Sequence, residues 1–124
     1  MSHGISRGKE PLNPEAHPAL ADEHACLLLA EDGDGCAGYV LGFWHLALFA
    51  NGPVAWVEEI IVRSQQRRSG VGLRLMSAFE EWAAERGCAQ VALATRRAAP
   101  FYLALGYQES AVYLRKVLPA GAAG

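Results

Sequence analysis

The chain has 124 residues, 52% of them hydrophobic and 19% charged, and this composition predicts one folded domain and excludes disorder along the whole length. A net charge of −2 is not the strong basic excess that nucleic-acid binding usually requires. The longest apolar run, residues 37–50, is shorter than the roughly 20 residues of a membrane-spanning helix. We therefore expect no nucleic-acid and no membrane partner, and the lack of an apolar leader favours the cytoplasm.

The first 25 residues are expected to form a flexible arm ahead of a domain that spans residues 26–118. Three prolines, Pro11, Pro14 and Pro18, and scattered charges interrupt any periodicity in the arm, and only residues 18–24 are compatible with a short helical turn.

Three strands are predicted next, at residues 26–31, 36–49 and 54–62. The Asp-Gly-Asp-Gly sequence at 32–35 predicts a hairpin turn, because Asp and Gly tolerate the positive φ that such turns need. Gly38 and Gly42 predict a bend or bulge within the second strand.

A helix is predicted over residues 70–86 from an apolar stripe with helical spacing, and Gly87 fits its end. The stripe consists of Val71, Leu75, Phe79, Trp82 and Ala83. A strand at 89–95, a short helix at 98–105 that ends at Gly106, and closing strands within 107–118 follow. This order predicts an α/β (α+β) fold with a mixed sheet and flanking helices.

The three cysteines at 26, 36 and 88 include no C-x-x-C pair, so we interpret them as small buried hydrophobes in a reducing environment. The four histidines lack metal-ligand spacing, and we expect no metal site. His45 is interpreted as a hydrogen-bonded strand residue, and Trp44, Trp56 and Trp82 as core.

A glycine-rich turn between a strand and a helix predicts a phosphate-binding cradle at residues 67–73 (Arg67, Arg68, Ser69, Gly70, Val71, Gly72 and Leu73). A helix start offers unpaired N–H groups and partial positive charge, and glycine lets the backbone approach a bulky anion. Leu75 and Met76 exclude the dinucleotide fingerprint and the P-loop. An ordinary tight turn before a helix remains the alternative.

Arg67 to Gly72 resembles the Arg/Gln-x-x-Gly-x-Gly/Ala motif of the GNAT superfamily of acetyl-CoA-dependent N-acetyltransferases. Two further matches flank it in the family's order: Glu-Glu-Ile-Ile-Val at 58–62, and Phe-Tyr-x-x-x-Gly-Tyr at 101–107. The resemblance covers roughly residues 27–118 and implies a mostly antiparallel sheet with a splayed parallel pair, at 54–62 and 89–95.

The resemblance also implies where acetyl-CoA, the co-substrate, binds. The glycine loop would hold its pyrophosphate, and backbone groups of Ile60, Ile61 and Val62 would bind its pantetheine arm and acetyl carbonyl. Thr95 stands where the family often has Asn, and it offers a hydroxyl in place of an amide. Arg96 and Arg97 either flank the adenosine end or are solvated.

The family usually begins with elements that shape the acceptor pocket, and here they are expected to be abbreviated, with about 25 residues before the first clear strand. We therefore expect uncovered apolar surface and a homodimer.

The resemblance implies two catalytic residues, Glu58 as general base and Tyr102 as the acid for the departing thiolate. In an ideal strand Glu58 and Glu59 point to opposite faces, but a bulge often lies near such sites, and Glu59 is the second candidate for the base. The alternatives without a catalytic role are that the two glutamates simply face solvent and that Tyr102 is simply an aromatic residue of the core. No cysteine matches a family nucleophile, so we expect acetyl transfer to a primary amine by direct attack. A catalytically silent acyl-CoA-binding module and a general nucleotide-phosphate binder are the other functions that the sequence permits.

Overall fold

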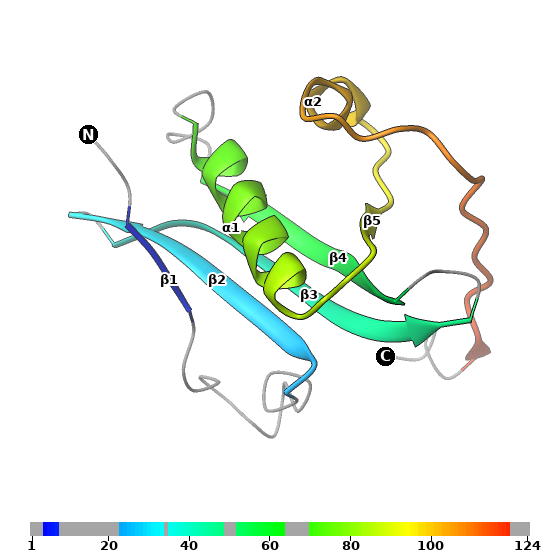
Figure 1. Ribbon diagram of the computed structural model, residues 1–124. Helices are drawn as coiled ribbons and strands as arrows, with labels where there is room; N and C mark the ends of the chain where they lie inside the picture. The colour runs from blue at the N-terminus through cyan, green and yellow to red at the C-terminus, as the bar shows by residue number, and fades with distance from the viewer. Residues whose placement is uncertain (1–3, 8–22, 34, 49–51, 64–69, 120–124) are drawn as a thin grey trace. The chain divides into compact units, whose positions relative to one another are not determined.

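The computed structural model describes residues 4–7, 23–33, 35–48, 52–63 and 70–119, which belong to two compact units, 1–93 and 94–124. The first unit contains five strands and helix α1, and the second contains helix α2 (Figure 1). In chain order the elements are β1 Gly4–Arg7, β2 Ala25–Asp32, β3 Gly35–Ala47, β4 Gly52–Val62, α1 Val71–Glu85, β5 Gln90–Leu93 and α2 Ala99–Ala104. None of the helices described here is long and apolar enough to cross a membrane.

The five strands form one mixed sheet in the order β1-β2-β3-β4-β5. Neighbouring strands pair antiparallel, except β4 and β5, which pair parallel. The predicted α/β fold with a mostly antiparallel sheet and a parallel strand pair is therefore confirmed. The predicted hairpin turn is also present, since Asp32 pairs with Gly35, whose φ is 104°.

Strand β1 lies in the segment for which we predicted a flexible arm, so that prediction is wrong for residues 4–7. The four residues of β1 are too few to show a periodic pattern, and they are held by antiparallel pairing with β2, from Gly4 opposite Glu31 to Arg7 opposite Leu28. Residues 1–3 and 8–22 of the predicted arm lie outside the described residues.

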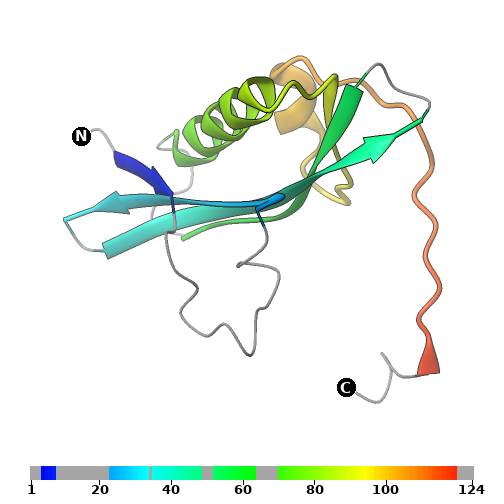
Figure 2. The same cartoon turned by 60° about the horizontal axis from the view of Figure 1, so that its bottom comes forward.

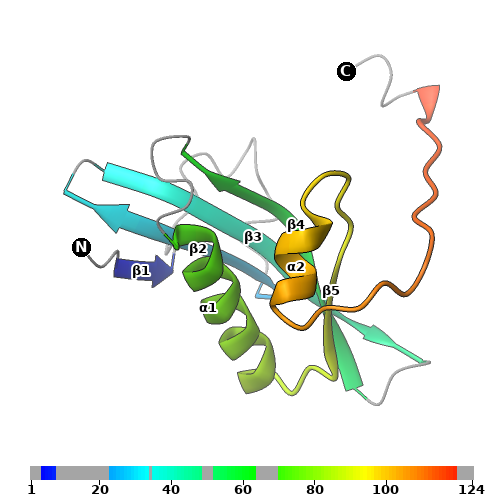
Figure 3. The ribbon, with the colours of Figure 1, turned by 90° about the horizontal axis from the view of Figure 1, so that it is seen from above.

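Helix α1 packs its apolar stripe on one face of the sheet (Figures 2 and 3). All five predicted stripe residues are buried, and Met76, which the prediction omitted, is buried with them. Gly70 and Gly87 bound the helix with φ values of 85° and 76°, in the left-handed region that glycine adopts without a Cβ penalty. The periodic pattern therefore predicted both the helix and its packing.

Two glycines of β3 allow α1 to lie close to the sheet. A Cβ atom at Gly42 would lie 2.4 Å from two ring carbons of Phe79, and one at Gly38 would lie 3.4 Å from Cδ1 of Leu75. Gly38 pairs with Val62 at the end of β4, whereas Gly42 pairs with Val57. Helix α1 therefore runs antiparallel to β4 and begins near the end of that strand.

A bulge interrupts the pairing of β3 with β4. Leu41 pairs with Glu59 and Gly42 pairs with Val57, so Glu58 is an extra residue without an opposite partner. The irregularity predicted near Gly42 is thus present, and the additional residue belongs to β4.

The second unit contains no strand among its described residues, so the predicted closing strands within 107–118 are wrong. Residues 108–118 are exposed, with 83% of Val112 and 85% of Leu114 accessible to solvent. Aliphatic and aromatic residues indicate that a segment can form a strand, but a strand forms only by pairing with a neighbouring strand, which the segment's own sequence does not specify. The predicted domain of 26–118 spans parts of both units.

The cysteine prediction holds in part. Cys26 is buried, but Cys36 is exposed and Cys88 is half-buried, and all three are free thiols. Burial raises the pKa of the Cys88 thiol, with Arg86 acting in the opposite direction. Trp82 is buried as predicted, and its ring lies 5.3 Å from that of Phe79.

We predict that Gly42→Ala destabilises the protein by about 1–3 kcal/mol, because the new methyl group overlaps the Phe79 ring and the backbone oxygen of Trp56. Urea unfolding measures the change. Gly33→Ala is the matched control, since a Cβ there has no atom within 4 Å, and it should stay within about 0.5 kcal/mol of the wild type. Equal stabilities of the two variants would contradict the packing described here.

Candidate functional site

Strand β4 continues beyond its parallel partner. The β4–β5 pairing extends from Val54 opposite Gln90 to Val57 opposite Leu93, and β4 then runs on to Val62 paired only with β3. The edge of β4 at residues 58–62 therefore presents backbone groups that the β4–β5 ladder does not use. Ile60, Ile61 and Val62, the residues expected to bind the pantetheine arm, lie in this stretch.

The start of α1 lies at the same end of β4. Gly70 precedes the helix, and its carbonyl accepts the first intrahelical bond, from Arg74 N–H at 3.0 Å. The N–H groups of Val71, Gly72 and Leu73 belong to the helix's first turn, where no earlier carbonyl within the helix is available to them. These residues can therefore present donors to an anion. Arg67, Arg68 and Ser69, predicted for the same cradle, lie outside the described residues.

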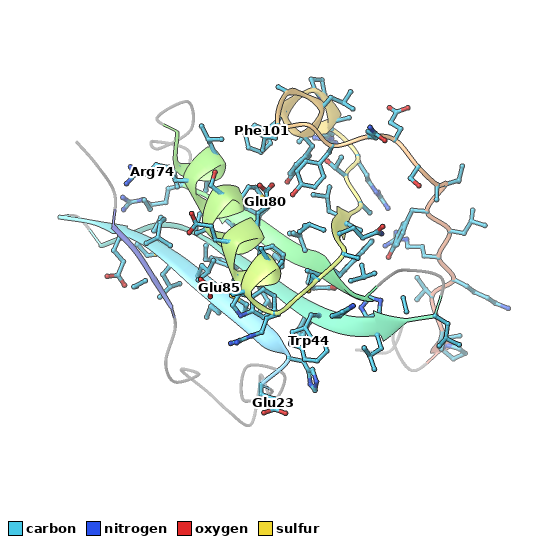
Figure 4. All side chains as sticks on the ribbon, viewed as in Figure 1. Glu23, Trp44, Arg74, Glu80, Glu85 and Phe101 are labelled. Atoms are coloured by element: carbon cyan, nitrogen blue, oxygen red, sulfur yellow. The ribbon has the colours of Figure 1, made fainter. Side chains whose placement is uncertain are left out.

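The charges along α1 are arranged against its dipole. The first turn contains no acidic residue and the last turn no basic one. Arg74 lies near the N-terminal end, whereas Glu80 and Glu85 lie farther along the helix (Figure 4). A stabilising arrangement would be the reverse, so the helix start keeps a positive potential.

The bulge turns the two adjacent glutamates of β4 to the same face of the sheet. Glu59 pairs with Leu41, which points away from α1 because its neighbour Gly42 faces the Phe79 ring. Glu58 contacts Trp56, which pairs with Phe43 and so points away from α1 as well. The alternation of an ideal strand, which would place the two carboxylates on opposite faces, does not hold here, because the bulge that we considered as the alternative adds a residue to β4.

The two exposed carboxylates have different partners. The indole N–H of Trp56 donates a hydrogen bond to Oε2 of Glu58 at 3.1 Å. The hydroxyl of Tyr39 donates a short hydrogen bond to Oε1 of Glu59. This bond, followed by partial burial, raises the pKa of the Tyr39 phenol to about 12, so Tyr39 remains a donor throughout the neutral range.

Thr95 and Tyr102 belong to the second unit and are described within it. The Thr95 hydroxyl accepts a hydrogen bond from Ala98 N–H at 3.1 Å, just before α2. Tyr102 is buried, and its ring lies 5.0 Å from that of Phe101 and 5.8 Å from that of Tyr107. Burial raises the pKa of its phenol, so Tyr102 keeps its proton to a higher pH than an exposed tyrosine.

Two residues at the site were not predicted in this role. Trp56 was interpreted as core, yet it is half-buried and hydrogen-bonded to Glu58. Tyr39 was not singled out, because its link to Glu59 depends on the register between β3 and β4, which no pattern within one strand reveals. His45, Arg96 and Arg97 are exposed.

Comparison with known proteins agrees with this geometry. The Acetyltransferase (GNAT) family matches residues 3–107 of the chain. The aminoglycoside N(6')-acetyltransferase type 1 of Serratia marcescens is 32% identical over 124 residues, which cover 86% of this chain and 83% of that protein.

Two solved structures show the same fold. AAC(6')-Iy, in complex with the bisubstrate analogue CoA-S-monomethyl-acetylneamine, superposes with a TM-score of 0.72 and 20% identity, over 94% of this chain and 99% of that one. Glucosamine-6-phosphate N-acetyltransferase from Arabidopsis thaliana gives a TM-score of 0.78 with 14% identity, over 94% and 98% of the two chains. The chain belongs to the GNAT family and is an N-acetyltransferase.

Proposed function

We propose that the protein transfers the acetyl group of acetyl-CoA to a primary amine by direct attack, with Glu58 as the general base. The observation that carries the proposal is the geometry at the end of β4. There the strand extends beyond its pairing with β5, and the bulge turns Glu58 to the exposed face. The start of α1 lies at the same end of the strand.

The residues present fit acetyl-CoA. Its pyrophosphate needs donors and positive potential, which the first turn of α1 supplies through Gly70, Val71, Gly72 and Leu73, with no carboxylate in that turn. Its pantetheine arm carries amides, and Ile60 to Val62 offer backbone groups on the open edge of β4. The bound cofactor supplies an activated thioester, and a backbone N–H on this edge is the kind of donor that a developing oxyanion requires.

Glu58 suits the role of base because its carboxylate is exposed and one of its oxygens is held by the indole of Trp56. An ammonium group is not a nucleophile, so the acceptor must lose a proton to Glu58, directly or through water. Tyr102 carries the proton that a thiolate leaving group needs, since burial raises the pKa of its phenol and so keeps it protonated in the neutral range.

The acceptor class that the comparisons favour is an amine of an aminoglycoside, since relatives above 30% identity act on these molecules. Thiol release from acetyl-CoA should be measured with an aminoglycoside, spermidine, an amino-acid ester and a peptide with a free N-terminus. Turnover with the aminoglycoside supports the proposal. Acetyl-CoA binding without turnover on any amine would instead indicate a silent binding module.

We predict that Gly72→Val weakens CoA binding by about tenfold or more, which is about 1.4 kcal/mol, because the branched side chain blocks backbone approach to the pyrophosphate. Calorimetric titration measures the affinity. Ser77→Val is the matched control, since it introduces the same residue at an exposed position of the same helix. Unchanged affinity in a folded Gly72→Val protein would remove the cradle from the proposal.

We predict that Glu58→Gln lowers kcat by about 10²–10⁴-fold on the plateau of the pH–rate profile, where the wild-type carboxylate takes the proton of the amine, and by less at low pH, where the base is itself protonated. The acidic limb of the pH–rate profile should disappear. Glu81→Gln, an exposed glutamate of α1, should leave the profile unchanged. A wild-type profile for Glu58→Gln would mean that another group or water takes the proton.

Tyr102→Phe should lower kcat while CoA affinity stays nearly intact, since only a hydroxyl group is lost. The alkaline limb of the profile should disappear with it. Because burial raises the pKa of Tyr102, the acid form persists to higher pH, and this limb should lie above the ordinary tyrosine value of about 10. Retention of the limb in the variant would exclude Tyr102 as the acid.

We also propose that the protein is a homodimer, as expected from its apolar surface. Leu46, at the end of β3, is 79% exposed, and Val112 and Leu114 are exposed to a similar extent. Large contiguous patches of exposed apolar side chains tend to mark interfaces with a partner. Sedimentation at micromolar concentration should show a dimer, and a pure monomer would overturn this point.

A further inference from the structure

The bulge leaves two carboxylates side by side on one face, and a general base must be distinguished from its neighbour. Glu58 and Glu59 are adjacent in sequence, both exposed, and both directed away from α1. Charge and exposure therefore do not distinguish Glu58 from Glu59. The hydrogen-bond donors that contact the two carboxylates do distinguish them.

The donor to Glu58 comes from the same strand. Trp56 lies two residues earlier on β4, so its side chain shares the face of Glu58 and its indole N–H reaches Oε2 at 3.1 Å. An indole N–H can donate but cannot accept, so the Glu58 carboxylate is the acceptor in this contact. No further hydrogen bond of the Glu58 carboxylate is found within the described part of the chain, and Oε1 is left to meet an incoming amine or water.

The donor to Glu59 comes from the neighbouring strand. Tyr39 pairs with Ile61 and shares a face with Leu41, the residue opposite Glu59. Its hydroxyl donates to Oε1 of Glu59, which ties the carboxylate back across β3. Glu59 is thereby held toward the interior of the sheet and not toward the β4 edge that borders β5.

We propose that Trp56 is a positioning residue that aims Glu58 at the acceptor amine, whereas Tyr39 holds the adjacent Glu59 out of the reaction. This assignment rests on the proposed function and extends it, because it identifies the groups that make one glutamate of the pair the base. Trp56 acts only through Glu58 and does not itself touch the reacting atoms.

The kinetic test compares Trp56→Phe with Trp44→Phe. Trp44 is a suitable control because it lies on β3 (Figure 4), on the face that packs against α1, and its indole N–H has no hydrogen-bond partner within the described residues. Trp56→Phe should lower kcat by about tenfold, a part of what a general base contributes, and leave the KM for acetyl-CoA unchanged. Trp44→Phe should keep kcat near the wild-type value.

A double-mutant cycle tests whether Trp56 affects kcat through Glu58. In the Glu58→Gln background, Trp56→Phe should cause little further loss, because the group through which Trp56 acts is already gone. An equal loss in both backgrounds would overturn the positioning role. So would a larger loss of kcat in Glu59→Gln than in Glu58→Gln.

A spectroscopic readout separates this inference from the proposed function. The indole N–H resonance of Trp56, assigned with Trp56→Phe, should move as the Glu58 carboxylate titrates and should become insensitive in Glu58→Gln. The resonance of Trp44 should not follow that titration. If no amine is acetylated but the Trp56 resonance behaves as described, the proposed chemistry fails while the contact stands. If the Trp56 resonance ignores Glu58, the inference fails even in an active enzyme.

Discussion

The contact between the Phe79 ring and the backbone of Gly42 sets the position of α1 on the sheet. A side chain at position 42 would occupy the volume that the ring fills, and tightly packed interiors tolerate such overlap poorly. The bulge of β4 lies at the same level of the sheet, since Gly42 pairs with Val57 and Leu41 pairs with Glu59. One region therefore fixes the helix and turns both glutamates to the exposed face.

The position of α1 has an electrostatic consequence. With Phe79 against Gly42 and Leu75 near Gly38, the helix begins at the end of β4 that extends beyond β5. Stability alone would favour acidic residues in the first turn, by roughly 0.3–1 kcal/mol each, and the chain has none there. This arrangement is what an anion-binding helix start requires, because a carboxylate in the first turn would compete with a phosphate for the same N–H groups.

Features that depend on local pattern were predictable from the sequence. The stripe from Val71 to Ala83 repeats with the helical period, and all of its members are buried. The glycines at 70 and 87 mark the ends of α1 because positive φ is costly for other residues. The parallel pairing of β4 with β5 follows from a strand–helix–strand order, whose crossover connection returns the chain in the same direction.

The register between strands, and the presence of a partner strand for the terminal segments, were not predictable. Residues 111–118 carry the aliphatic and aromatic side chains that strands favour, yet they are exposed and form no strand, because composition reports a capacity for pairing and not the presence of a neighbouring strand. Conversely, β1 shows no pattern but is held by pairing with β2.

The two glutamates of β4 are the clearest case of a feature that depends on the register between strands. Strict alternation assigns them to opposite faces, and only the register of β3 against β4 reveals the extra residue that brings them together. Once they share a face, the choice between them depends on donors from two different strands, Trp56 beside Glu58 on β4 and Tyr39 across from Glu59 on β3. The sequence of β4 alone can therefore identify the pair of candidate bases, but the two can be distinguished only from the pairing of β4 with its neighbour in the sheet.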